Sequence, residues 1–426
     1  MFQSIFSSDF KKNAAKLLSA NVISQVIALA VYPVVTRQYS TEEVGVFGTF
    51  MAICSVLFVA STGRYEGAIQ LPKSNRDASA LFQICLRIAT VFAVLLLIII
   101  LCFKNLILTA FSIEPVGWGI GFIPLLVLLN AVGVAWMPWS NRNKAFGLTG
   151  GYLITQNLTN SITKIFFGFL KMTRLGLIYS LALSYICSLL LIIKKITDKK
   201  WTSDLFRQDS KRMREMATVY ANYPKYNMPL SLINTFSSNI PLLLLAPFFE
   251  KGIIGCYSLA VTIGLRPIIL FNNSMCNVFF QRISEACHKR ESIFPLIKNY
   301  FLTGISILIP LFACIYIFSV PLVCWLFGEE WAETATILNI LLPWFLTVIL
   351  VKTFTFIPDI FFKQKKSMIM EVIYLALRTL ALLYGIYRND FFIAMVAFSA
   401  VSALFLLYQA GWYYRLIANY ERQLTK

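Results

Sequence analysis

Long apolar segments separated by short polar ones fill most of the chain. Each is about 20 residues long, the length that a helix rising ~1.5 Å per residue needs to cross a hydrocarbon layer ~30 Å thick. The segments do not alternate in polarity as the strands of a membrane barrel do, so they are predicted to be helices. We therefore predict an all-α, polytopic membrane protein with about 12 transmembrane helices, at residues 14–35, 45–62, 78–102, 117–138, 150–170, 175–193, 226–248, 252–280, 296–320, 333–356, 367–387 and 391–416.

Composition supports this class and leaves little room for catalysis. Apolar residues make up 58% of the chain and charged residues 14%, far from the balance of a soluble globular protein. The predicted loops are too short to hold a soluble catalytic domain. The nine cysteines form no CxxC pair, and His288 is the single histidine. We predict no catalytic residue, no metal ligand and no cofactor.

The segment 194–225 divides the predicted spans into two sets. It mixes many basic residues with several acidic ones and reads as a water-exposed hinge on the cytoplasmic side. We predict an N-terminal six-helix lobe at 1–193, a basic cytoplasmic hinge at 194–225, and a C-terminal six-helix lobe at 226–426. A weak repeat supports the two lobes, because residues 43–47 (EVGVF) resemble 253–257 (IIGCY) at corresponding places.

The formal net charge of +18 follows from the loops. With the N-terminus in the cytoplasm, most basic residues fall on the cytoplasmic side, as the positive-inside rule requires. Both termini are therefore predicted to be cytoplasmic. This distribution explains the charge without a nucleic-acid partner, and none is predicted.

Polar side chains recur at helical spacing inside several predicted spans. On one interpretation they only join helices, each hydrogen bond contributing roughly 0.6–2 kcal/mol. On the other they line a shared hydrated cavity, which the occurrence of such stripes in both lobes favours. The predicted lining residues are Asn21, Gln25, Asn160, Asn227, Ser231, Asn234 and Asn273.

Five basic residues also lie within predicted spans: Arg87, Lys164, Arg266, Lys352 and Arg378. A basic residue at the bilayer centre costs about 2.5–3.5 kcal/mol, so most of them are not expected to face lipid. Arg87, Lys164 and Lys352 lie nearer span ends, where snorkelling to the interface is the alternative to a cavity role. We predict a cationic cavity that binds an anion, centred on Arg266 and Arg378.

Glu371 is the acidic residue placed well inside a predicted span. It lies seven residues before Arg378, on the same helix face, with Tyr374 between them. A structural ion-pair network and a titrating, ion-coupling role both fit this position. The chain has no GxxxxGK[ST] phosphate loop, so direct use of nucleotide energy is not expected.

Two stretches near the N-terminus carry a family resemblance. Residues 33–48 (PVVTRQYSTEEVGVFG) and 64–72 (RYEGAIQLP) resemble the N-terminal signature of bacterial O-antigen flippases, the polysaccharide transporters of the MATE-like MOP exporter superfamily. The resemblance implies two six-helix lobes around a central cationic cavity. Within the signature, Arg64 and Glu66 are candidates for coupling or substrate contact, or for a local ion pair.

The resemblance also implies a cargo and a location. The cargo is an undecaprenyl-diphosphate-linked oligosaccharide, moved from the cytoplasmic to the periplasmic leaflet of the bacterial inner membrane by alternating access. Membrane lipids, a polysaccharide polymerase and chain-length proteins are the implied partners. Two alternatives stay open: a membrane polysaccharide polymerase or ligase, which is expected to have a large periplasmic loop, and an exporter of cationic drugs, which the sign of the buried charge disfavours.

Overall fold

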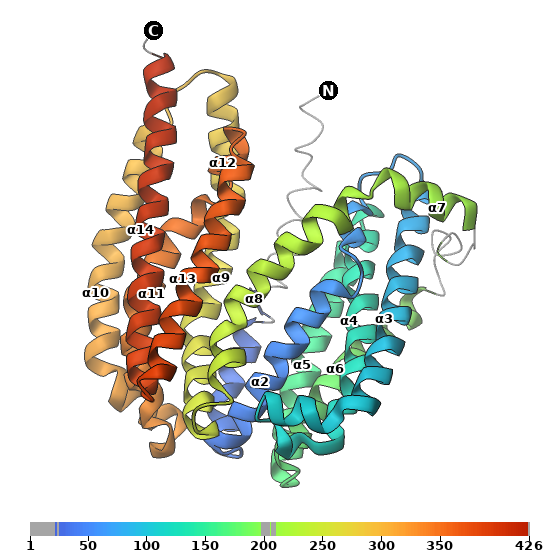
Figure 1. Cartoon of the computed structure of the whole chain (residues 1–426). Helices are drawn as coiled ribbons and strands as arrows, with labels where there is room; N and C mark the ends of the chain where they lie inside the picture. The colour runs from blue at the N-terminus through green and yellow to red at the C-terminus, as the bar shows by residue number, and fades with distance from the viewer. Residues whose placement is uncertain (1–21, 24, 197–204, 206–209, 425–426) are drawn as a thin grey trace. The chain divides into compact units, whose positions relative to one another are not determined.

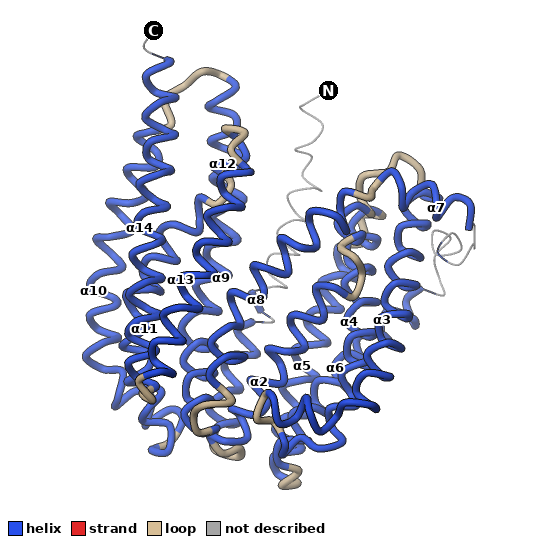
Figure 2. The backbone as a smooth tube through the Cα atoms, viewed as in Figure 1, coloured by secondary structure: helices blue, strands red, loops and turns tan. Residues whose placement is uncertain are grey.

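The structure, a computed structural model, describes residues 22–23, 25–196, 205 and 210–424. Figure 2 shows that these residues form helices and loops, and no strand occurs among them. The chain divides into two compact units, unit 1 (Met1–Pro247) and unit 2 (Phe248–Lys426). Each unit is described by itself below.

Unit 1 is a bundle of helices whose described part begins with the apolar helix Gln25–Thr36. Within the bundle, α5 packs on α6, α3 on α4, and α2 on α8 (Figure 1). The further elements are α2 (Thr41–Ala60), η2 (Tyr65–Ala68), α3 (Asn75–Ala110), η3 (Glu114–Gly121), α4 (Phe122–Arg142), α5 (Phe146–Phe169), α6 (Thr173–Ile196), α7 (Ser210–Val219), the π-helical turn η5 (Tyr223–Asn227) and α8 (Met228–Leu245).

Unit 2 is arranged around α11, which packs against α9, α10 and α14. Most of the apolar length of α11 is buried, whereas α10 is exposed along most of its length, as expected for a helix that faces lipid. Its elements are α9 (Lys251–His288), α10 (Phe294–Phe327), η6 (Glu329–Trp331), α11 (Ala332–Val351), η7 (Lys352–Phe354), α12 (Ile357–Ile360), α13 (Gln364–Tyr387) and α14 (Phe391–Leu424).

The prediction of an all-α polytopic membrane protein is confirmed. Among the described residues, ten helices are long and apolar enough to cross a membrane. Helix Gln25–Thr36 is apolar but shorter in its described part. The helix α5 is not among the ten, because Gln156, Asn160 and Lys164 lower its hydropathy.

Several helices run past the predicted ends of their spans. The spans 252–280, 296–320 and 391–416 correspond to α9, α10 and α14, which end at His288, Phe327 and Leu424. Hydropathy marks where the hydrocarbon layer ends, while backbone hydrogen bonding continues into the polar residues beyond it. Predicted span ends therefore fall short of helix ends at these places.

The described part of the segment 194–225, predicted to be a water-exposed hinge, belongs to unit 1 and packs within it. Helix α7 lies on α3. Met213 of α7 and Leu205, which precedes α7, are 5% and 2% exposed. Arg212 pairs with Asp77 at the start of α3. The division between units falls after α8, because α8 packs on α2. The lobe boundaries at 194–225 stay a prediction.

Candidate functional site

A half-buried ion pair joins two helices of unit 2. The Lys352 Nζ lies 2.7 Å from Glu371 Oε1, and the two side chains are 25% and 19% exposed. Lys352 stands where α11 gives way to η7, and Glu371 lies in the second turn of α13. The sequence suggested an ion-pair network around Glu371, and Lys352 is the basic residue that the structure brings to it. The carboxylate neutralises this lysine locally.

The Arg378 guanidinium lies among three aromatic rings. Its central carbon is 5.2 Å from the centre of the Trp344 ring, 4.9 Å from Tyr374 and 4.4 Å from Phe398. The rings belong to α11, α13 and α14, and Arg378 is 3% exposed. Cation–π attraction strengthens in such desolvated surroundings. Arg378 therefore holds three helices of unit 2 together.

Arg266 has the opposite surroundings, because its side chain is exposed. It lies 15 residues after the start of the 38-residue helix α9, which places it about 22 Å along the helix axis. Asn273, also exposed, follows seven residues later. Seven residues are close to two helical turns, so both side chains share one face of α9. Arg266 and Asn273 thus add two exposed polar side chains to one side of a helix that is apolar as a whole.

In unit 1, Lys164 of α5 lies beside the N-terminal signature. Its Nζ is 5.8 Å from the ring centre of Tyr32 and 5.3 Å from that of Phe47. The Tyr39 hydroxyl donates a hydrogen bond of 2.9 Å to the Lys164 carbonyl oxygen. Burial, with the nearby Glu43 carboxylate, raises the pKa of Tyr39 to about 12, so this hydroxyl keeps its proton. The lysine is thus positioned by aromatic residues of the signature.

The remaining predicted lining residues differ in exposure. Arg87, Asn227 and Asn234 are exposed. Gln25, Asn160 and Ser231 are half-buried. Asn21 lies outside the described residues. The structure thus brings Lys352 to Glu371 and Lys164 to the signature, and the prediction that all these residues line one cavity stays a prediction.

The signature residues Arg64 and Glu66 form an ion pair of 3.3 Å. Arg64 has a φ of 61°, in the left-handed region that follows the end of α2. The other oxygen of the Glu66 carboxylate accepts a hydrogen bond from the Thr62 hydroxyl at 2.5 Å, and Glu66 is 8% exposed. These contacts favour the local interpretation, in which the pair fixes the turn between α2 and α3.

The signature also holds α7 and η5 in place. The Tyr65 hydroxyl donates a hydrogen bond of 3.1 Å to the Ala217 carbonyl oxygen. A Cβ on Gly67 would lie 2.9 Å from Cε1 of Tyr223, so glycine permits this close approach. Earlier in the signature, Ser40 and Glu43 form a capping box at the start of α2. Much of the signature therefore has a structural reason.

Sequence reasoning missed one polar contact inside unit 1. The Asn130 side-chain amide of α4 donates a hydrogen bond of 2.9 Å to the Tyr185 hydroxyl of α6. Both residues lie in apolar runs, where a single polar side chain gives no periodic signal. Among the described residues, no group of three or more His, Cys, Asp or Glu side chains could hold a metal ion.

Known proteins resemble this chain in sequence. A model of the polysaccharide biosynthesis protein family matches residues 34–336. The chain is 21% identical over 346 residues to the probable low-salt glycan biosynthesis flippase Agl15 of Haloferax volcanii, a match that covers 78% of this chain and 68% of the relative.

Two solved structures show the shared fold. The lipid II flippase MurJ in an inward closed conformation has a TM-score of 0.70 at 16% identity, covering 96% of this chain and 91% of that chain. An inward-facing multidrug resistance MATE family transporter of the MOP superfamily has a TM-score of 0.68 at 14% identity, covering 93% and 96%. Because the family model matches well over half of the sequence, the chain belongs to the polysaccharide biosynthesis protein family, and its fold is that of MOP-superfamily transporters.

Proposed function

We propose that the protein is a flippase that moves undecaprenyl-diphosphate-linked O-antigen or polysaccharide repeat units from the cytoplasmic to the periplasmic leaflet by alternating access. Family membership and the flippases among its relatives support this proposal. The protein carries cargo and catalyses no bond change. It resides in the bacterial inner membrane with both termini in the cytoplasm, and it works beside a polysaccharide polymerase and chain-length proteins.

The observation that carries the proposal is the exposure of Arg266 deep within α9. An arginine at this depth costs about 2.5–3.5 kcal/mol if it faces lipid, so a polar surrounding is strongly preferred. A diphosphate diester carries two negative charges and pairs well with a guanidinium. Arg266 is therefore the residue to which we assign contact with the diphosphate.

Exposed amides supply contacts for the sugars. Asn273 shares the face of Arg266, and Asn227 and Asn234 are exposed near the start of α8 and along it. An amide offers both donors and acceptors, as sugar hydroxyls require. Such side chains can bind repeat units of differing composition.

The other predicted cations take different parts in the proposal. Arg378 acts from within its ring cage, where it stabilises unit 2 and adds positive potential. Lys352 is neutralised by Glu371, and this pair supports a structural role more than a titrating one. Arg87 is exposed, and Lys164 is half-buried; contact of either with cargo stays a prediction.

The membrane potential can drive this movement. Transfer of negative charge out of a cell that is negative inside is favoured by about 2.3 kcal/mol per charge per 100 mV. A diphosphate therefore needs no coupling ion when its charge crosses the potential. Glu371 as a proton-coupling residue is accordingly not required.

Reconstitution into vesicles tests the function. The purified protein is placed in liposomes with fluorescently labelled undecaprenyl-diphosphate oligosaccharide, and a membrane-impermeant quencher reports the leaflet that the label occupies. We expect faster translocation of this lipid than of a neutral polyprenyl glycoside with the same sugars. Equal rates for the two lipids would contradict an anionic cargo, and transport of a cationic dye in place of the glycolipid would support the drug-exporter alternative.

A further inference from the structure

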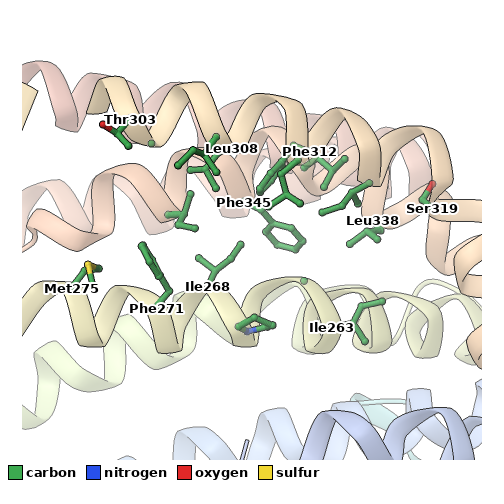
Figure 3. A pocket seen from close by; sticks show the side chains of 18 of the residues that line it. Ile263, Ile268, Phe271, Met275, Thr303, Leu308, Phe312, Ser319, Leu338 and Phe345 are labelled. Carbon is green, nitrogen blue, oxygen red and sulfur yellow. The ribbon is translucent and has the colours of Figure 1, made fainter. Parts of the chain in front are cut away.

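Unit 2 contains an apolar groove between α9, α10 and α11, with a volume of about 970 Å³. We call it the unit 2 groove. Figure 3 shows Ile268 and Phe271 of α9 on one side, with Leu308 and Phe312 of α10 and Phe345 of α11 across from them. None of the residues of the ion pair or of the ring cage described above lines it.

The groove has a buried floor and exposed walls. On its floor, Phe345 and Val323 are 1% and 2% exposed. On its walls, Ile307, Leu311 and Phe271 are 60%, 49% and 42% exposed. A groove of this kind is open along one side, and in a membrane-spanning bundle that side meets hydrocarbon.

The length of the groove points to its occupant. Its lining residues on α10 run from Leu296 to Phe327, a helix length of about 46 Å. The hydrocarbon layer is about 30 Å thick, so the acyl chains of one leaflet reach only about 15 Å into it. A phospholipid acyl chain from one leaflet ends near the midplane and cannot fill such a groove. A polyprenyl chain, which is much longer, can follow it through both leaflets.

Polar and basic residues gather at one end of the groove. Asn299, Tyr300 and Thr303 line the end nearest the start of α10. Arg282, which follows the lining residue Phe279 by three positions, is exposed. Three residues are nearly one helical turn, so Arg282 extends the same side of α9. Positive charge at this end complements a diphosphate.

The groove and Arg266 lie on opposite faces of α9. The lining residues Gly264, Pro267, Ile268, Phe271 and Met275 share one side of the helix. At 3.6 residues per turn, Arg266 and Asn273 project from the other side. One helix thus carries the groove on one side and the exposed side chains of Arg266 and Asn273 on the other.

We propose that the unit 2 groove holds the polyprenyl chain of the cargo in a loading state, with the diphosphate at the end marked by Asn299 and Thr303. This inference rests on the proposed function. The polyprenyl chain enters the groove from lipid that is equally apolar, so the hydrophobic effect does not favour binding. Close packing against the groove is what selects this chain over other lipids. From this state the head group moves to Arg266.

Photo-crosslinking in nanodiscs tests the inference on the full-length protein. The probe is undecaprenyl diphosphate with a diazirine in its chain, and labelled peptides are mapped by mass spectrometry. We expect label on the lining residues of α9 and α10. Ile307→Trp and Leu311→Trp should reduce this labelling by about tenfold, the effect of losing roughly ten close carbon contacts.

Matched controls use the same helix and the same kinds of residue. Ile309 and Ile317 of α10 are 53% and 66% exposed, and neither lines the groove. Ile309→Trp and Ile317→Trp should leave labelling unchanged. A farnesyl diphosphate probe, whose chain is too short to follow the groove, should label it weakly.

Several results would overturn the inference. These are label spread equally over both faces of α10, equal labelling of the groove by a diazirine-bearing phosphatidylcholine, and crosslinks from the groove to a second copy of the chain. Labelling requires no translocation. A protein that labels in the groove but moves no glycolipid contradicts the proposed function alone, and one that moves glycolipid without labelling there contradicts the groove alone.

Discussion

Lys352 donates a hydrogen bond of 2.7 Å to Glu371 and thereby joins the end of α11 to α13. The same lysine lies 5.5 Å from the ring centre of Tyr374, and Arg378 lies 4.9 Å from that ring. Tyr374 therefore interacts with two cations on one side of α13, and the carboxylate of Glu371 balances one of them. The ion pair of Lys352 and Glu371 and the ring cage around Arg378 can therefore be tested separately.

Removal of one partner of the pair should destabilise unit 2. Glu371→Gln leaves Lys352 charged and half-buried, which should cost about 1–3 kcal/mol. Thermal unfolding in detergent, followed by size-exclusion chromatography, measures the change. The exchange variant Lys352→Glu/Glu371→Lys should recover part of the loss. A melting temperature of Glu371→Gln equal to that of the unaltered protein would show that the pair contributes nothing.

The cage around Arg378 should distinguish arginine from lysine. Arg378→Lys keeps the charge but loses the planar group that stacks on the rings, and we expect a loss of about 1–2 kcal/mol. Thermal unfolding measures this loss, and Phe398→Leu should lower the melting temperature in the same direction. Arg388, exposed at the end of α13, is the matched control, because Arg388→Lys should change little. Similar effects at both arginines would contradict the cage.

The contact between Gly67 and Tyr223 should keep α7 and η5 in place. Gly67→Ala introduces a Cβ 2.9 Å from the Tyr223 ring, and such overpacking typically costs about 1–3 kcal/mol. Hydrogen–deuterium exchange should become faster in Ser210–Val219. Gly147→Ala in α5, where a Cβ meets nothing within 4 Å, is the control. Unchanged exchange in Gly67→Ala would mean that the signature does not hold this segment.

The capping box at Ser40 should stabilise the start of α2. Ser40→Ala removes the oxygen that accepts from the Glu43 backbone N–H, at a cost of about 1 kcal/mol. Ser40→Asp keeps an acceptor and should retain most of the stability. The melting temperatures of the two variants give the comparison, and equal losses in both would argue against a capping role.

The sequence predicted the class of fold because hydropathy and span length report directly on the membrane. It could not place the pair of Lys352 and Glu371, since these residues lie on different helices and only packing brings them together. It grouped Arg378 with Arg266 by their depth in apolar runs. Depth does not say which face of a helix a side chain occupies, and the structure finds one buried among rings and the other exposed.

The groove could not be predicted from the same patterns. Its residues, such as Ile307 and Phe345, are apolar in a chain where apolar residues are the majority. They differ from ordinary lipid-facing residues only because α9, α10 and α11 leave a groove between them. The signature, in contrast, was visible as a motif, and the structure supplies contacts for Ser40, Tyr65 and Gly67 that explain part of it.

Translocation by Arg266 variants tests the central claim most directly. In the vesicle assay with labelled undecaprenyl-diphosphate oligosaccharide, Arg266→Ala should fold normally, since its side chain is exposed, and should translocate at least about tenfold more slowly, as loss of a charged contact worth roughly 1.5–3 kcal/mol implies. Arg266→Lys should be intermediate, and Lys289→Ala, a change of an exposed cation just after α9, should match the unaltered protein. Full activity of correctly folded Arg266→Ala would contradict the assignment of Arg266 to the diphosphate.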